Sequence, residues 1–119
     1  MSARVIAVAV DCHEPETLAE FWKAALGYPE TERWQDSHGV TYVELKAPGQ
    51  ASLLFQPVPE AKTVKNRLHL DLAPGTGGQR EEVERLAALG AELVEDPHDD
   101  PWIVLRDPEG NEFCVLPPR

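Results

Sequence analysis

The stretch Trp102-Ile-Val-Leu-Arg-Asp-Pro-Glu-Gly-Asn-Glu-Phe-Cys-Val115 predicts two strands joined by a tight turn. Apolar residues at its start form the first strand, and residues 113–115 belong to the second. The intervening residues 107–111 are typical of a turn, because Asp bonds the backbone ahead of it, Pro pre-sets φ and Gly accepts a positive φ. The C-terminal part of the chain is therefore expected to be a β-hairpin.

Outward from this hairpin, one order of elements occurs twice. In the first half we expect a strand at 4–11, a helix that starts at Glu14 and Pro15 and stops at Gly27, and strands at 30–36, 40–46 and 51–57. In the second half we expect a strand at 67–72, a helix at 79–89, and strands at 91–95, 101–106 and 112–116.

This order predicts an α+β fold, with two tandem βαβββ modules that form a cupped mixed sheet around a central cleft. The modules are residues 1–57 and 67–119, and residues 58–66 form a linker within a single domain of 119 residues. On the first strand of the second module, the leucines at 68, 70 and 72 share one face, and His69 and Asp71 share the other.

Composition excludes several classes of protein. The net charge is −10, and each half of the chain carries −5, which argues against a nucleic-acid or anionic-membrane partner. This charge favours a cationic ligand only weakly, and it also serves solubility. There is no apolar run of about 20 residues and no leader-like N-terminus, so a cytoplasmic protein is expected. The two cysteines, Cys12 and Cys114, do not suggest a disulfide framework.

Three segments together resemble the glyoxalase-like proteins of the vicinal-oxygen-chelate superfamily, in a subgroup often seen in actinobacteria. They are Asp11-Cys-His-Glu-Pro15, Lys65-Asn-Arg-Leu-His-Leu-Asp-Leu72 and the hairpin from Trp102 to Val115. The superfamily contains glyoxalase I, the bleomycin-resistance proteins and the extradiol dioxygenases. The resemblance covers the whole chain, and it implies paired βαβββ modules, a homodimer and a ligand or metal site in the cupped sheet.

The resemblance also implies where metal ligands would lie. Metal enzymes of the superfamily carry one ligand on the first and fourth strand of each module, and the last of these is usually a glutamate. The matching positions here are Ala7, Leu53, His69 and Cys114. Two of them have no donor atom, and nearby Gln56 is expected to face the other way. No cofactor is therefore expected; a divalent ion, if one were bound, would use His69, Glu112 and Cys114.

The ligand-binding candidates are His69, Asp71, Trp102 and Cys114, with Tyr42 and Phe55 as additions. His69 is either a group facing the cleft or a structural histidine. Cys114 is either a small buried residue or a thiol that His69 activates. Strand aromatics such as Tyr42 and Phe55 are either core residues or the walls of a flat pocket. The acidic stretch at 95–100 is interpreted as a solvated loop rather than a cation site.

Three functions remain open. The leading interpretation is a glyoxalase/bleomycin-resistance-like protein that binds a small, cationic or aromatic molecule in the cleft and has a degenerate metal site. The alternative is a metal-dependent lyase, isomerase or dioxygenase that uses His69 with Glu112 or Cys114. The third is an interaction module whose dimer surface is its function. Catalytic residues are not assigned, and the sequence leaves open whether the chain is an enzyme.

Overall fold

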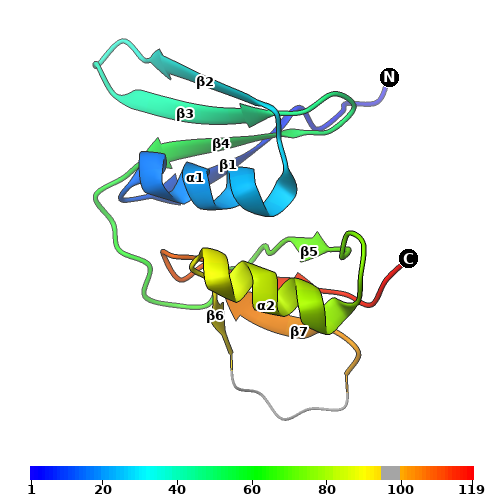
Figure 1. Ribbon diagram of the computed structural model, residues 1–119. Coiled ribbons are helices and arrows are strands. Elements are labelled where there is room, and N and C mark those ends of the chain that lie inside the picture. The colour runs from blue at the N-terminus through cyan, green and yellow to red at the C-terminus, as the bar shows by residue number, and fades with distance from the viewer. Residues whose placement is uncertain (95–99) are drawn as a thin grey trace. The chain divides into compact units, whose positions relative to one another are not determined.

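The computed structural model describes residues 1–94 and 100–119, so most of the predicted acidic loop at 95–100 lies outside the described residues. The chain divides into two compact units, unit 1 (Met1–Ala61) and unit 2 (Lys62–Arg119). Each unit has the element order β-α-β-β-β (Figure 1). The prediction of an α+β fold built from two βαβββ modules is confirmed. Neither helix in the described part of the chain is long and apolar enough to cross a membrane.

Unit 1 contains one four-stranded sheet and one helix. Its elements are β1 (Ala7–Cys12), α1 (Pro15–Leu26), β2 (Glu30–Gln35), β3 (Thr41–Lys46) and β4 (Ser52–Pro57). The strand order is β1-β4-β3-β2, with β1 parallel to β4 and antiparallel pairing elsewhere. All five elements lie within two or three residues of their predicted bounds, because strand alternation and helical spacing are both strong in this half.

Helix α1 covers one face of this sheet. Pro15 occupies its first turn, where the missing N–H leaves no hydrogen bond unmade, and Leu18, Phe21 and Trp22 are buried. Gly27 ends the helix in the left-handed conformation, with φ of 70°, and its N–H donates to Lys23 O at 2.8 Å. The sheet residues buried on the same side are Val43, Leu45, Leu53 and Phe55. Alternation directs the residues between them to the opposite, open face.

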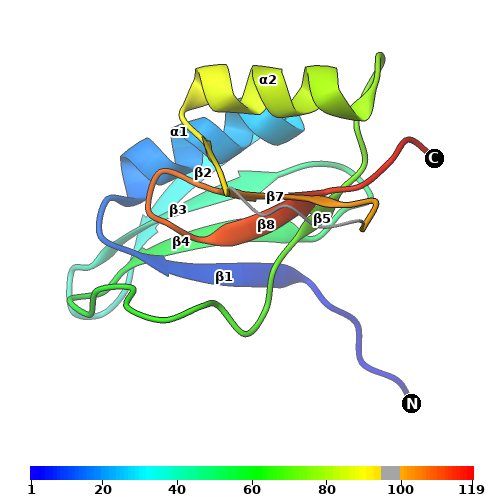
Figure 2. The same cartoon turned by 90° about the horizontal axis from the view of Figure 1, so that it is seen from below.

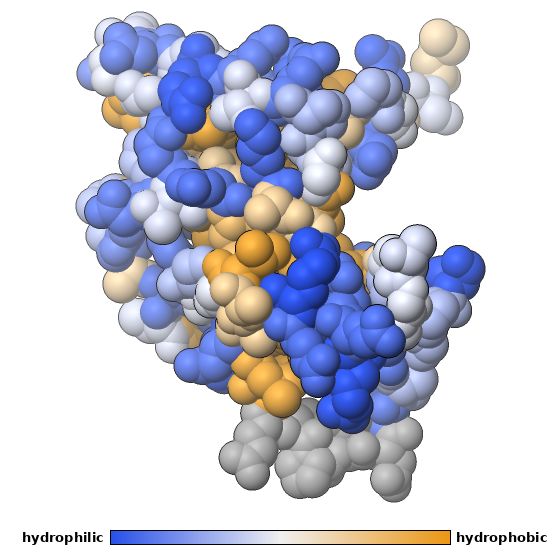
Figure 3. Space-filling model, in the orientation of Figure 1, coloured by the Kyte–Doolittle hydropathy of each residue, from blue (hydrophilic) through white to orange (hydrophobic). Residues whose placement is uncertain are grey.

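Unit 2 repeats this plan with shorter strands. Its elements are β5 (Asp71–Leu72), α2 (Gln79–Leu89), β6 (Glu92–Leu93), β7 (Ile103–Arg106) and β8 (Glu112–Val115). The strand order is β5-β8-β7-β6, with β5 parallel to β8. Figure 2 shows α2 lying over one face of this sheet. The core beneath it consists of Val83, Leu86, Leu105, Phe113 and Val115. On the face of the molecule shown in Figure 3, hydrophilic residues predominate over both units.

The strand predicted at 67–72 is much shorter in the structure. Only Asp71 and Leu72 pair with β8, and Leu68 is 85% exposed. The alternating leucines therefore do not form one buried face. Directly before β5, Cys114 N still donates to Leu70 O at 2.9 Å. Further back the segment is held by a side chain, because Glu112, at the start of β8, accepts a hydrogen bond from the backbone N–H of Asn66 at 3.0 Å.

A candidate ligand site on the open face of unit 2

Alternation along β8 places the first candidate residue. Phe113 and Val115 are buried under α2, so Cys114 between them lies on the opposite face of the sheet, which we call the open face of unit 2. Cys114 is the register partner of Asp71 on β5 and of Val104 on β7. It is 7% exposed, because strands flank it on both sides.

Three side chains of different chemistry meet here. His69, Asp71 and Cys114 each offer one donor atom, and these atoms all lie within 4.8 Å of one another. His69 Nε2 is 3.3 Å from Asp71 Oδ1, and both side chains are partly exposed. Imidazole, carboxylate and thiolate are donors for zinc and other first-row divalent ions, and a catalytic site needs three of them and an open position. We call these residues the donor trio.

The surroundings of Cys114 keep its thiol protonated in the metal-free protein. Burial raises the pKa of Cys114, and the negative charge of Asp71 raises it further, while the positive charge of Lys65 opposes these effects in part. The thiolate is the nucleophilic form, so this environment does not favour a free Cys114 nucleophile activated by His69. A bound cation would reverse the balance, because metal coordination deprotonates a thiol.

Glu112 is engaged elsewhere and does not belong to the trio. Its carboxylate accepts from Lys62 Nζ at 3.0 Å and from the backbone N–H of Asn66 at 3.0 Å, and its side chain is 13% exposed. Burial alone would raise the pKa of Glu112, but these two hydrogen bonds hold it below its ordinary value. Of the predicted donor set, His69 and Cys114 lie in the observed cluster, and Asp71 rather than Glu112 is its third member. The expectation that no metal would be bound does not fit this cluster.

Unit 1 has no such trio at the matching positions. Phe55 pairs with Val43 on β3 as Val115 pairs with Ile103 on β7, so Leu54 matches Cys114. Leu54 in turn pairs with Ala9 on β1, which matches Asp71, and two residues earlier Ala7 matches His69. None of these three residues carries a donor.

This register corrects one predicted position. Leu53 is buried under α1 and faces away from the open face of unit 1, so the residue that matches Cys114 is Leu54. Gln56 lies on the opposite face of the sheet from Leu53, as expected. That face is the open face of unit 1, where Gln56 Nε2 donates to Asp11 Oδ1 at 2.9 Å. An offset of one residue reverses every side chain on a strand, which is why the sequence alone misassigned the face.

The aromatic candidates lie in different environments. Phe55 has no exposed surface and packs in the core of unit 1, so it offers nothing to a ligand. Tyr42 stacks on Trp34, with ring centroids 4.4 Å apart, and its hydroxyl donates to Asp36 Oδ2 at 3.1 Å. Trp102 belongs to unit 2, where it precedes β7 and is 39% exposed. Of the aromatic candidates, only Trp102 lies in the same unit as the donor trio.

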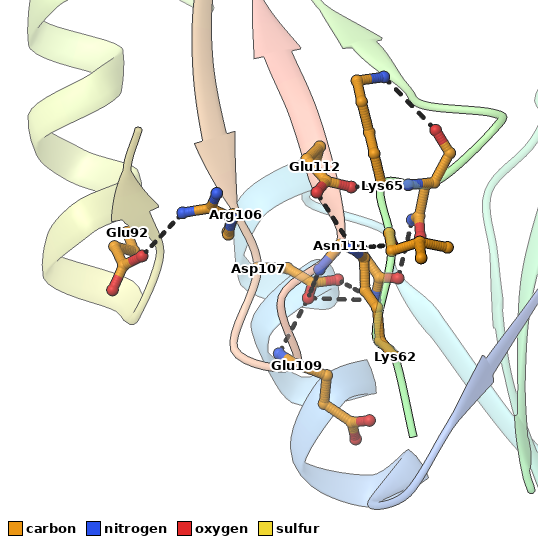
Figure 4. A network of polar contacts seen from close by, with 10 residues as sticks. Lys62, Lys65, Glu92, Arg106, Asp107, Glu109, Asn111 and Glu112 are labelled. Atoms are coloured by element: carbon orange, nitrogen blue, oxygen red, sulfur yellow. Dashed lines mark hydrogen bonds and ion pairs between the residues drawn. The ribbon is translucent and has the colours of Figure 1, made fainter. Parts of the chain in front are cut away.

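An open groove lies on the same face of unit 2 as Cys114. Among the described residues it is lined by Lys62, Thr63, Val64, Lys65, Val94, Val104, Arg106, Glu109, Gly110 and Glu112. Val104 is the strand partner of Cys114, so the groove adjoins the donor trio. Figure 4 shows part of its wall, in which Arg106 reaches Glu92 and Asp107 organises the turn to Asn111. This groove was not predicted from the sequence, because four of its ten lining residues fall in the predicted linker at 58–66 and the others come from distant segments.

Comparisons with known proteins support the fold. A variant of the fosfomycin resistance protein FosX from Listeria monocytogenes, complexed with Mn(II) and dihydroxypropylphosphonic acid, matches with a TM-score of 0.77 at 13% identity, over 98% of this chain and 93% of that one. Glyoxalase I from Leishmania major has a TM-score of 0.70 at 16% identity, with coverage of 97% and 86%.

A glyoxalase/bleomycin resistance protein/dioxygenase family enzyme from Burkholderia phytofirmans has a TM-score of 0.65 at 19% identity, with coverage of 95% and 97%. No curated protein sequence matches the chain. The model of the glyoxalase-like domain family matches residues 7–116, which is nearly the whole chain. The repeated βαβββ order, the hairpin at 102–115 and this match lead to one conclusion: the chain belongs to the glyoxalase-like domain family.

Proposed function

We propose that this protein binds a small organic molecule on the open face of unit 2. The observation that carries the proposal is the convergence of His69, Asp71 and Cys114, whose donor atoms all lie within 4.8 Å. Trp102 has the same strand alternation as Val104, so its partly exposed ring is expected on the same face. Ligand sites commonly combine a few convergent polar groups with apolar and aromatic walls.

The family supports a small ligand, and unit 1 supports a degenerate site. The FosX variant from Listeria monocytogenes holds Mn(II) together with a small phosphonic acid. In this chain, Ala7, Ala9 and Leu54 replace donors in unit 1, so the described residues provide one donor set rather than two. The matching positions of unit 1 therefore add no donor to those of unit 2, which supports a degenerate form of the family's metal site.

A fluorescence screen tests this function. The protein is titrated with amphipathic molecules of negative, neutral and positive charge while quenching of tryptophan fluorescence is recorded. We expect saturable binding by at least one class, and its loss in His69→Ala and Asp71→Asn. His38→Ala, which changes an exposed turn residue of unit 1, is the matched control and keeps binding. If no class of molecule binds saturably, the proposed function is wrong.

The second candidate is a metal-dependent lyase, isomerase or dioxygenase, and the donor trio favours it. His69, Asp71 and Cys114 would hold a divalent ion, and such an ion supplies Lewis-acid polarisation of a coordinated oxygen. The exposed sides of His69 and Asp71 leave room for a substrate beside them. The remaining chemistry would depend on what the adjoining groove binds and orients.

Metal content separates the two candidates. The untagged protein is purified without chelators, and its zinc, nickel, manganese and iron are measured by mass spectrometry. About one ion per chain, lost in His69→Ala and kept in His38→Ala, would favour the enzyme. A well-folded protein without metal would leave the binding protein as the better assignment.

The family resemblance also leads us to propose a homodimer. Sedimentation velocity measures the mass of the native protein, and a monomer at micromolar concentration would contradict this proposal. The same measurement on His69→Ala tests the interaction-module alternative, in which the site substitution leaves both the dimer and the cellular phenotype unchanged.

A further inference from the structure

The groove beside Cys114 differs in charge from the rest of the protein. Its lining contains three basic residues, Lys62, Lys65 and Arg106, and two acidic ones, Glu109 and Glu112, for a formal charge of +1. The whole chain has 11 basic and 21 acidic residues, for a charge of −10. More than a quarter of all the cations in the chain therefore border one groove.

The three cations are not equivalent. Lys62 is committed to the fold, because its ammonium donates to Glu112 Oε2 at 3.0 Å and to Val64 O at 2.6 Å, and its side chain is 23% exposed. This contact pairs one positive charge of the groove with one of its two negative charges. The balance therefore stays at +1, and it is carried by Lys65 and Arg106 against Glu109 alone.

Lys65 and Arg106 make only weak contacts within the protein, so each can bind a ligand instead. Lys65 is exposed, and its ammonium makes a 3.4 Å contact with Asn66 O, which is long for a hydrogen bond. Arg106 Nη1 is 3.2 Å from Glu92 Oε1 in an ion pair whose side chains are 41% and 73% exposed. Exposed pairs of this kind are weak, so a ligand can replace Glu92 as the partner of Arg106 (Figure 4).

The rest of the lining offers apolar surface. Val64 is 75% exposed, and Val94 and Val104 are partly exposed, so three valine side chains are available to an apolar body. Val94 N donates to Val104 O at 3.0 Å, which places two of the valines on neighbouring stretches of backbone. An apolar ligand part would cover these side chains and remove them from water.

We infer that the ligand of unit 2 is a small organic anion with an apolar body, bound in this groove by Lys65 and Arg106 beside the donor trio. The inference rests on the proposed function, because it names the class of molecule that the open face of unit 2 binds. The inferred ligand is an anion, whereas the net charge of −10 would favour a cation. The local arrangement of side chains outweighs the total, because at about 8 Å of screening length distant charges contribute little.

A matched pair of dyes tests the charge of the ligand. 8-Anilinonaphthalene-1-sulfonate is an anion with an apolar body, and N-phenyl-1-naphthylamine has the same rings without the sulfonate. Fluorescence titration of the full chain is expected to show saturable binding of the sulfonate and weaker binding of the neutral dye. Lys65→Gln and Arg106→Gln should each weaken sulfonate binding on the order of two- to fivefold, the range of an exposed ion pair. Arg80→Gln, on the exposed side of α2, is the control for losing a cation.

A gain-of-affinity variant makes the test sharper. Glu92→Gln removes the carboxylate that competes for Arg106 and should tighten sulfonate binding, with no effect on the neutral dye. Glu84→Gln removes the same charge from α2 and is expected to change nothing beyond the general charge effect. Equal binding of the two dyes, or equal effects of Glu92→Gln and Glu84→Gln, would overturn the anion inference and leave the proposed function intact. Absence of any saturable binding, by either dye or by the ligand screen, would overturn both.

Discussion

Asp71 lies directly opposite Cys114 in the parallel pairing of β5 with β8, so a carboxylate neighbours the thiol. Burial is the largest cause of the raised pKa of Cys114, and the charge of Asp71 adds to it. The thiol of Cys114 therefore keeps its proton until a bound cation displaces it. This relationship connects the chemistry of the site to a measurable reactivity.

Asp71→Asn should lower the pKa of Cys114 and speed its alkylation at neutral pH. The increase should be severalfold and not complete, because burial remains. The rate is measured with iodoacetamide between pH 7 and pH 10 in a Cys12→Ser background, so that one thiol reports. Asp11→Asn, an equal change of charge in unit 1, serves as the control and should leave the rate unchanged. A rate that does not respond to Asp71→Asn would show that burial alone sets this pKa.

Glu112 should contribute stability that depends on pH. Its pKa in the folded protein lies below the ordinary value of 4.5, so its contribution is complete above about pH 4.5 and is lost as the pH falls through the lower folded pKa. Glu112→Gln should cost about 1–3 kcal/mol at pH 7, because Lys62 loses its charged partner. Urea unfolding from pH 7 to pH 3 measures the difference, which should shrink below pH 4.5. For Glu84→Gln the difference should stay small throughout, and a similar profile for both variants would contradict this account.

Phe55 should behave as a core residue. It has no exposed surface in unit 1, so Phe55→Ala is expected to lower the free energy of unfolding by about 3–5 kcal/mol. Leu68→Ala, at a site that is 85% exposed, should change it by less than about 0.5 kcal/mol. Denaturant unfolding gives both values. A mild effect of Phe55→Ala together with altered ligand binding would return Phe55 to the binding site.

Gly27 should resist substitution. Its φ of 70° is unfavourable for residues with a Cβ, so Gly27→Ala is expected to cost about 1–2 kcal/mol although no atom would clash with the added carbon. Gly75 has ordinary φ and open space around it, so Gly75→Ala is the control and should be neutral or slightly stabilising. Thermal unfolding of both variants checks the difference. Equal midpoints would mean that the backbone at Gly27 relaxes freely.

The elements with a strong periodic signal could be predicted from the sequence. α2 begins at Gln79 and ends at Leu89 as expected, and α1 stops at Gly27, because helical spacing and a terminal glycine act within one segment. The turn at Asp107 is also a local feature, and its carboxylate accepts from the N–H groups of Glu109 and Asn111. Local interactions of this kind can be predicted from a single sequence.

The errors share a different cause, which is contact between distant segments. Nothing in the sequence near Lys62 indicates that it pairs with Glu112, fifty residues away. When that contact is not known, Glu112 is taken for an available metal ligand and the strand at 67–72 is predicted too long. The part of the groove that Lys62 and Glu112 line is then not predicted at all. Likewise, the register of β4 decides whether Leu53 or Leu54 faces outward, and register depends on the partner strand.

Unit 1 repeats the strand order of unit 2 and has Ala7, Ala9 and Leu54 at the positions of the donor trio. Each molecule therefore contains an internal control, which is a folded sheet of the same strand order without the three donor side chains. Ala7→His, Ala9→Asp and Leu54→Cys would place the same three kinds of donor on a sheet of the same strand order, and the number of divalent ions bound per chain, before and after these changes, would show whether that sheet can form a site of its own.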